Sequence, residues 1–111
     1  MRRVMCVLGV SLTVLSTDAA FGQDLVERGE AVYAAQRCQL CHAVAGKGNA
    51  KGPLDGVGGR LTPEAIREWI VNPAAMTEKT KASRKPAMRA YGALGKDDLD
   101  ALVAYLQSLK K

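Results

Sequence analysis

Two cysteines and a histidine stand close together in the chain, where Cys38, Cys41 and His42 form the pattern C-x-x-C-H. Two thiols at this spacing can each add to one vinyl group of a porphyrin. The imidazole that follows directly can then reach the iron at the porphyrin centre. The pattern is typical of covalent attachment of c-type haem.

Three other uses of the same residues are weaker. A thioredoxin-like C-x-x-C belongs in a strand–helix–strand setting, whereas a helix is expected before Cys38. A structural zinc site requires four ligands, and His42 is the only histidine in the sequence. A disulfide between Cys38 and Cys41 would close almost no loop and so restrict the unfolded chain little. It would also leave the adjacent histidine unexplained.

Residues 1–22 have the composition of a secretory signal. Two arginines precede an almost uniformly apolar run over residues 4–15, and small side chains follow at Ala20 and Gly22. We therefore expect cleavage after Gly22 and a mature domain over residues 23–111. The apolar run has about twelve residues, too few to cross a hydrocarbon core of about 30 Å. No stable membrane insertion is expected.

Composition indicates one small domain with a thin core. The chain has 111 residues, of which 48% are hydrophobic and only 5% aromatic. So short a chain with few large apolar side chains buries little of its own surface, and a haem would fill the interior. The formal net charge is +5, but the basic residues are scattered and few aromatics interleave with them. Nucleic-acid binding is therefore not indicated.

Three helices are expected to position the C-x-x-C-H pattern. Asp24 and Glu27 form a capping signature, which predicts a helix over residues 25–37. A glycine-rich loop follows over residues 46–59. A second helix begins with Thr62 as its N-cap and Pro63 in its first turn, and it ends at Asn72-Pro73.

The last third of the chain contains an irregular segment and a third helix. Residues 74–90 are mostly polar and basic without a clear period. A helix is expected over residues 96–110, because apolar residues recur there at helical spacing. These are Leu99, Leu102, Val103 and Leu106. The predicted fold is all-α: three main helices and long loops wrapped around one covalently bound haem.

Over residues 24–110 the chain resembles a class I, monohaem, c-type cytochrome of bacterial periplasms. The resemblance rests on the C-x-x-C-H pattern together with Gly29 and Tyr33 on the first helix and Leu102 and Tyr105 on the last. It implies that the two helices cross closely at the glycine. It also implies thioether bonds from both cysteines to one haem c, and a periplasmic location.

The resemblance also implies the groups that surround the haem. His42 is the expected proximal iron ligand, its other ring N–H held by a backbone carbonyl. In the family that carbonyl lies in a G-P-x-L segment. This chain has Gly52-Pro53-Leu54, one residue shorter, so Pro53 is the expected acceptor and Gly52 the alternative. Arg60 and Trp69 are expected to hydrogen-bond the haem propionates.

The sixth iron ligand is expected from the C-terminal half, where Met76, Met88, a lysine or water are the candidates. Met88-Arg89-Ala90-Tyr91 resembles the family's M-P-x-[YF] loop, with an arginine where proline is common. Met76 directly follows the second helix, too early for the chain to travel around the haem. Met88 is therefore the expected ligand.

These features together indicate a one-electron carrier rather than an enzyme. Its partners would be periplasmic, a dehydrogenase as donor and an oxidase or reductase as acceptor, and a monomer is expected. A basic rim around the ligand loop would steer it toward acidic partners. This rim comprises Lys79, Lys81, Arg84, Lys85 and Arg89, and Glu78 is the only acidic residue among them.

Two alternatives remain open from the sequence. One is a five-coordinate haem enzyme or gas sensor, which would lack the methionine ligand. The other is a dedicated cytochrome subunit of a periplasmic dehydrogenase.

Overall fold

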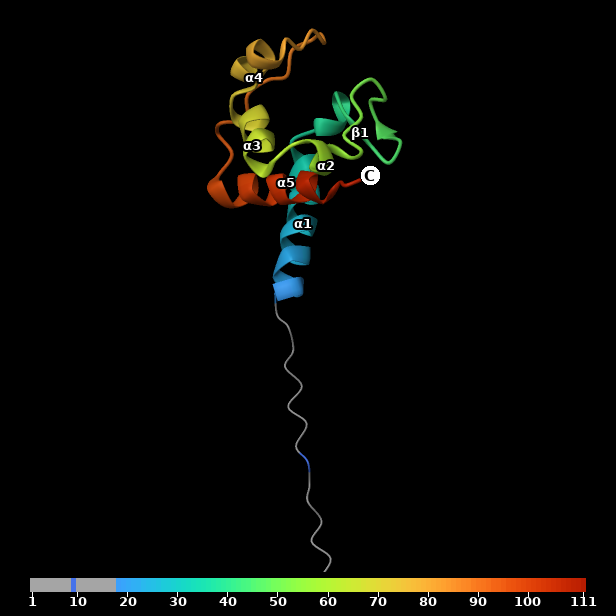
Figure 1. Ribbon diagram of the computed structural model, residues 1–111, viewed down its shortest axis with the longest axis vertical. Helices are drawn as coiled ribbons and strands as arrows, with labels where there is room; N and C mark the ends of the chain where they lie inside the picture. Colours follow the sequence, from blue (N-terminus) through green and yellow to red (C-terminus); the bar gives the residue numbers. More distant parts are fainter. Residues whose placement is uncertain (1–8, 10–17) are drawn as a thin grey trace, which may run out of the picture.

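The computed structural model describes residue 9 and residues 18–111; most of the expected signal segment lies outside these residues. The chain is mostly helical (Figure 1), which confirms the predicted all-α class. The elements in order are α1 (Asp18–Ala35), the 3₁₀ turn η1 (Cys38–Leu40), β1 (Ala43–Val44), β2 (Lys47–Gly48), α2 (Val57–Arg60), α3 (Pro63–Val71), α4 (Pro73–Thr80) and α5 (Lys96–Ser108).

Helix α5 lies across α1 in close contact (Figure 1). Gly29 of α1 meets the backbone of α5 so closely that a Cβ atom there would overlap the carbonyl oxygen of Ala101. The rings of Tyr33 and Tyr105 meet edge to face beside it, with centroids 5.6 Å apart. The predicted crossing is therefore present, and it requires glycine at this position of α1.

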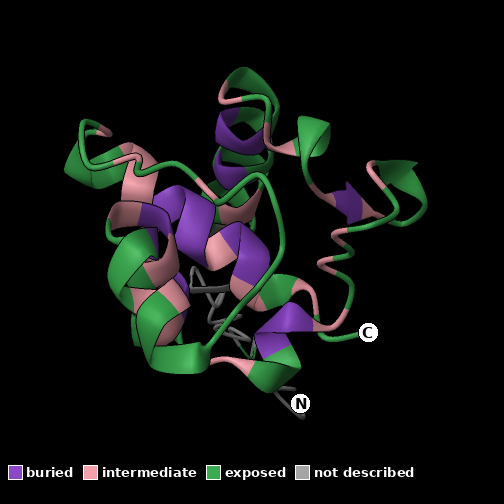
Figure 2. Cartoon of the chain, turned by 90° about the horizontal axis from the view of Figure 1, so that it is seen from above, coloured by how far each residue is buried: buried purple, intermediate pink, exposed green. Residues whose placement is uncertain are grey.

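The core forms where α1, α3 and α5 meet, with buried segments in the middle of the domain and exposed turns around them (Figure 2). Ile66 and Ile70 of α3 pack toward Leu102 and Leu106 of α5. Within residues 18–111, no helix has both the length and the apolar composition that a membrane crossing requires. The buried side chains of this core are Val32, Tyr33, Val57, Ile66, Ile70, Leu102, Val103, Tyr105 and Leu106.

Helix α1 differs from its predicted bounds. It begins at Asp18 rather than near Leu25, so it runs through the expected cleavage site. Asp24 therefore lies inside the helix and does not cap it. The two alanines after Asp18 are strong helix formers, and no proline interrupts the segment.

Helix α4 and the short hairpin β1–β2 were not predicted. The prediction that Asn72-Pro73 ends the second helix is correct, but Pro73 also occupies the first turn of α4. Proline stops one helix and starts another, because its missing N–H is harmless in a first turn. The Thr62 cap of α3 is confirmed, since its side-chain oxygen accepts from the backbone N–H of Ala65.

We predict that Gly29→Ala strongly destabilises the fold. The added methyl group cannot enter the crossing unless the backbones of α1 and α5 move apart, and such overpacking typically costs about 1–3 kcal/mol. The free energy of unfolding of the haem-bearing protein in a denaturant titration measures this loss.

Gly92→Ala is the matched control, since the nearest atom to a Cβ there is the carbonyl oxygen of Val71, 3.9 Å away. It should leave the unfolding free energy nearly unchanged. Equal stability of the two variants would contradict a crossing that requires glycine.

Candidate functional site

A cavity of about 910 Å³ lies between the end of α1, the helices α3 and α5, and residues 82–91. This volume is near the upper end of the 300–1,000 Å³ typical of ligand sites. The lining surface is more apolar than polar. The leucine, isoleucine and valine side chains of the lining are Leu40, Leu54, Val57, Leu61, Ile66, Ile70, Leu102 and Leu106.

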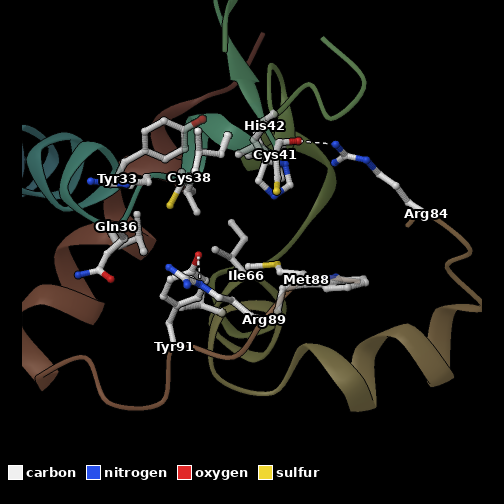
Figure 3. A pocket seen from close by; sticks show the side chains of 18 of the residues that line it. Tyr33, Gln36, Cys38, Cys41, His42, Ile66, Arg84, Met88, Arg89 and Tyr91 are labelled. Atoms are coloured by element: carbon white, nitrogen blue, oxygen red, sulfur yellow. Dashed lines mark hydrogen bonds between the residues drawn. The ribbon is translucent and has the colours of Figure 1, made fainter. Parts of the chain in front are cut away.

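A tight turn after α1 brings the C-x-x-C-H residues to this cavity. Arg37 adopts a left-handed conformation with φ 58°, which ends the helical path. The carbonyl of Cys38 then accepts from the backbone N–H of Cys41 at 3.1 Å and from that of His42 at 2.9 Å. All three side chains line the cavity (Figure 3).

The two cysteines are free thiols in different surroundings. Cys38 is half-buried and Cys41 is exposed. Burial raises the pKa of Cys38 to about 11, so its thiol stays protonated and uncharged at neutral pH. No disulfide joins them, and both sulfur atoms are available for thioether bonds.

The imidazole of His42 is held by Gly52 and not, as expected, by Pro53. Its Nδ1 lies 3.0 Å from the Gly52 carbonyl oxygen. The same oxygen accepts from the backbone N–H of Ala43 at 3.1 Å, while Leu54 donates to the Ala43 carbonyl at 2.8 Å. This pairing sets the register of residues 52–54. Successive carbonyls of an extended segment point to opposite sides. Because the Gly52 carbonyl points toward residues 42 and 43, the Pro53 carbonyl points away from His42.

These contacts leave His42 suited to bind a metal. A carbonyl only accepts, so Nδ1 carries the proton and Nε2 keeps its lone pair. Burial lowers the pKa of His42; the hydrogen bond to Gly52 opposes this shift, and the charge of Arg84 adds to it. The neutral imidazole with a fixed tautomer is the form that ligates metals.

The other expected site residues, Met88, Arg60 and Trp69, also line the cavity. Met88 is half-buried, and it faces His42 from the opposite wall (Figure 3). Met76 lies on α4 and is not part of the lining. Arg60 donates to the backbone carbonyl of Asp55 at 2.8 Å.

Two arginines make contacts that the sequence did not indicate. Arg84 donates from Nη2 to the Cys41 carbonyl at 2.6 Å, across 43 residues of sequence. The Arg89 guanidinium lies 5.1 Å from the ring centroid of Tyr91, and its Nε donates to the Tyr91 hydroxyl at 3.1 Å. Both were expected as members of the basic rim. No local pattern could have shown the Arg84 contact, because it depends on how two distant loops meet.

The site fits a covalently bound haem. It combines an apolar cavity of suitable size, two free thiols, and a neutral imidazole with its second nitrogen free. The zinc alternative has no support, since residues 18–111 contain no cluster of three histidine, cysteine, aspartate or glutamate side chains that could hold a metal.

Comparison with known proteins points to the same chemistry. The family model described as Cytochrome c matches residues 26–110. Cytochrome c oxidase subunit 2 of Alkalihalophilus pseudofirmus is 32% identical over 97 residues, which is 79% of this chain. The match covers only 27% of that relative, so the chain spans about a quarter of its length. No solved structure matches the chain.

We predict that the fold depends on attachment at the cysteines. Replacing both Cys38 and Cys41 by alanine would leave an apolar cavity of about 910 Å³ without its occupant. This loss removes much of the buried apolar contact of a small domain. Far-ultraviolet circular dichroism of the double variant should show a largely unstructured chain.

Gln39→Ala is the control, because it changes an exposed residue of the same turn and leaves both thiols in place. It should keep its haem and its helical signal. Native helical content in the double variant would refute the dependence.

Proposed function

The chain belongs to the cytochrome c family, and on that premise we propose that it is a periplasmic one-electron carrier with His42 and Met88 as axial iron ligands. Haem-based electron transfer is the general function of this family. The bound haem supplies a one-electron iron couple. The observation that carries the proposal is that His42 and Met88 face each other from opposite walls of one cavity (Figure 3).

The two axial side chains have complementary roles. His42 presents Nε2 because the Gly52 carbonyl holds Nδ1. Met88 supplies a thioether from a half-buried position. Histidine–methionine ligation raises the reduction potential. With a protein ligand on each side, no position stays open for a substrate, which favours electron transfer over catalysis.

The remaining site residues would attach the haem and hydrogen-bond its propionates. Thioether bonds from Cys38 and Cys41 would hold one edge of the haem. Arg60 and Trp69 are proposed to donate to the propionates, whose burial without donors would be costly. Arg60 is already oriented by its bond to Asp55 and has further N–H groups to offer.

The proposed contact with redox partners uses lysines. Lys79, Lys81 and Lys85 are exposed; Arg84 and Arg89 are exposed as well, but their guanidinium groups hydrogen-bond within the chain. The three lysines would attract acidic surfaces on a donor or acceptor. Secretion by a signal over residues 1–22, cleaved after Gly22, would place the monomer in the periplasm.

A second candidate is a permanent subunit of a larger oxidoreductase. The similarity to an oxidase subunit of which this chain matches only a part favours it. Size-exclusion chromatography of the protein from its own host separates the two: a free carrier elutes as a monomer, and a subunit elutes in a large complex.

We predict that Met88→Ala abolishes the far-red methionine–iron absorption band of the oxidised protein and lowers its midpoint potential. Replacement of the thioether removes the ligand that favours the reduced iron. Visible spectroscopy and a redox titration measure both effects.

Met76→Ala is the matched control, since that methionine lies outside the cavity lining, and it should change neither quantity. If Met76→Ala removed the band while Met88→Ala kept it, the assignment would be wrong.

We also predict that changing Lys79, Lys81 and Lys85 to glutamate slows electron transfer to an acidic partner at low salt. The rate should then rise with added salt, because the interaction becomes repulsive. The midpoint potential should move little, since exposed charges are well screened. Stopped-flow kinetics over a range of ionic strength test this.

Changing Lys47, Lys51 and Lys111 to glutamate gives the same charge change at exposed positions elsewhere. This control should slow the reaction much less. Equal slowing in both triple variants would assign the effect to net charge and not to the lysines near Met88.

A further inference from the structure

The segment that carries Met88 is weakly held by its own backbone. The N–H of Ala82 donates to the Thr77 carbonyl at 3.1 Å, and that of Tyr91 donates to the Ile70 carbonyl at 2.9 Å. Between these two points, no backbone group of residues 83–90 pairs with another backbone group of the described chain. Arg84, Pro86, Ala87, Met88 and Arg89 of this stretch line the cavity. A segment without backbone pairing retains conformational entropy and by itself positions a side chain poorly.

Arg84 connects this segment to the opposite side of the cavity. Its guanidinium donates to the Cys41 carbonyl at 2.6 Å (Figure 3). The same group rests on Gly52, where a Cβ atom would overlap it. Cys41 directly precedes His42, and Gly52 holds the imidazole of His42. Arg84 therefore contacts the residue that precedes the proposed proximal ligand and the residue whose carbonyl holds its imidazole.

Arg89 does not make a comparable connection. Its partner, Tyr91, lies two residues away, so the contact orders the end of the segment without joining it to another part of the fold. Within the described chain, the side-chain hydrogen bond that ties residues 83–90 to the C-x-x-C-H turn is that of Arg84.

We propose that Arg84 is a positioning residue for the axial ligand: its bond to Cys41 holds residues 83–90 so that Met88 stays opposite His42. This inference rests on the proposed role of Met88. The guanidinium suits the task, because it is always charged and offers several donors, one of which reaches Cys41 while the group lies against Gly52. A lysine would keep the charge but offers a compact, more strongly hydrated ammonium.

Imidazole competition measures how firmly the segment holds Met88. Imidazole added to the oxidised, haem-bearing protein must displace the methionine, and the far-red methionine–iron band reports the displacement. Arg84→Gln should bind imidazole about tenfold more tightly than the parent, which corresponds to about 1.4 kcal/mol. The imidazole affinity of Arg84→Lys should lie between those of the parent and of Arg84→Gln, because an ammonium can restore a single donor.

Lys85→Gln is the matched control, because it removes the same charge one residue away. The Lys85 side chain makes no hydrogen bond or ion pair within the described residues. It should bind imidazole like the parent. If Arg84→Gln and Lys85→Gln bind imidazole equally well, the proposal is overturned.

A second measurement separates this proposal from the ligand assignment. Backbone ¹⁵N order parameters of the reduced protein report the order of residues 83–90 whatever ligates the iron. They should fall in Arg84→Gln and not in Lys85→Gln. If the parent protein lacks the methionine–iron band but the order parameters of residues 83–90 still fall in Arg84→Gln, Met88 is not the iron ligand. The bond from Arg84 to Cys41 would then still be what orders the segment. Unchanged order parameters in Arg84→Gln refute the connection.

Discussion

The rest of the structure depends on the contact between Gly29 and the backbone of Ala101. This contact sets how closely α5 can lie across α1. It thereby places the end of α1, where the cysteine turn begins, beside Leu102 and Leu106 of α5. The cavity forms in the angle between the two helices. A side chain at residue 29 would separate the helices and alter the walls of the cavity at the same time.

Gly52 has a similar role behind His42. One carbonyl oxygen accepts from the backbone of Ala43 and from the imidazole of His42. The absent side chain leaves room for the Cys41 carbonyl and for the Arg84 guanidinium. Because these contacts share one residue, the orientation of the imidazole and the course of residues 83–90 are linked through it. A residue with a side chain would disturb both.

The basic residues near Met88 divide by type. All of them are exposed, but the arginines contact the chain itself, one at a carbonyl and one at an aromatic ring, while the lysines make no side-chain hydrogen bond within the described residues. A guanidinium offers several donors in a fixed plane and is less strongly hydrated than an ammonium. The arginines therefore suit internal positioning, and the lysines suit long-range attraction of a partner.

The sequence by itself determined the features that depend on near neighbours. The C-x-x-C-H spacing, the Thr62 cap and the apolar stripe of α5 all act over a few residues, where backbone geometry dictates which groups meet. Tertiary structure alone decided that Gly52 and not Pro53 faces His42, and that Arg84 reaches Cys41. Those contacts join loops far apart in the chain, and their register follows from how the helices pack.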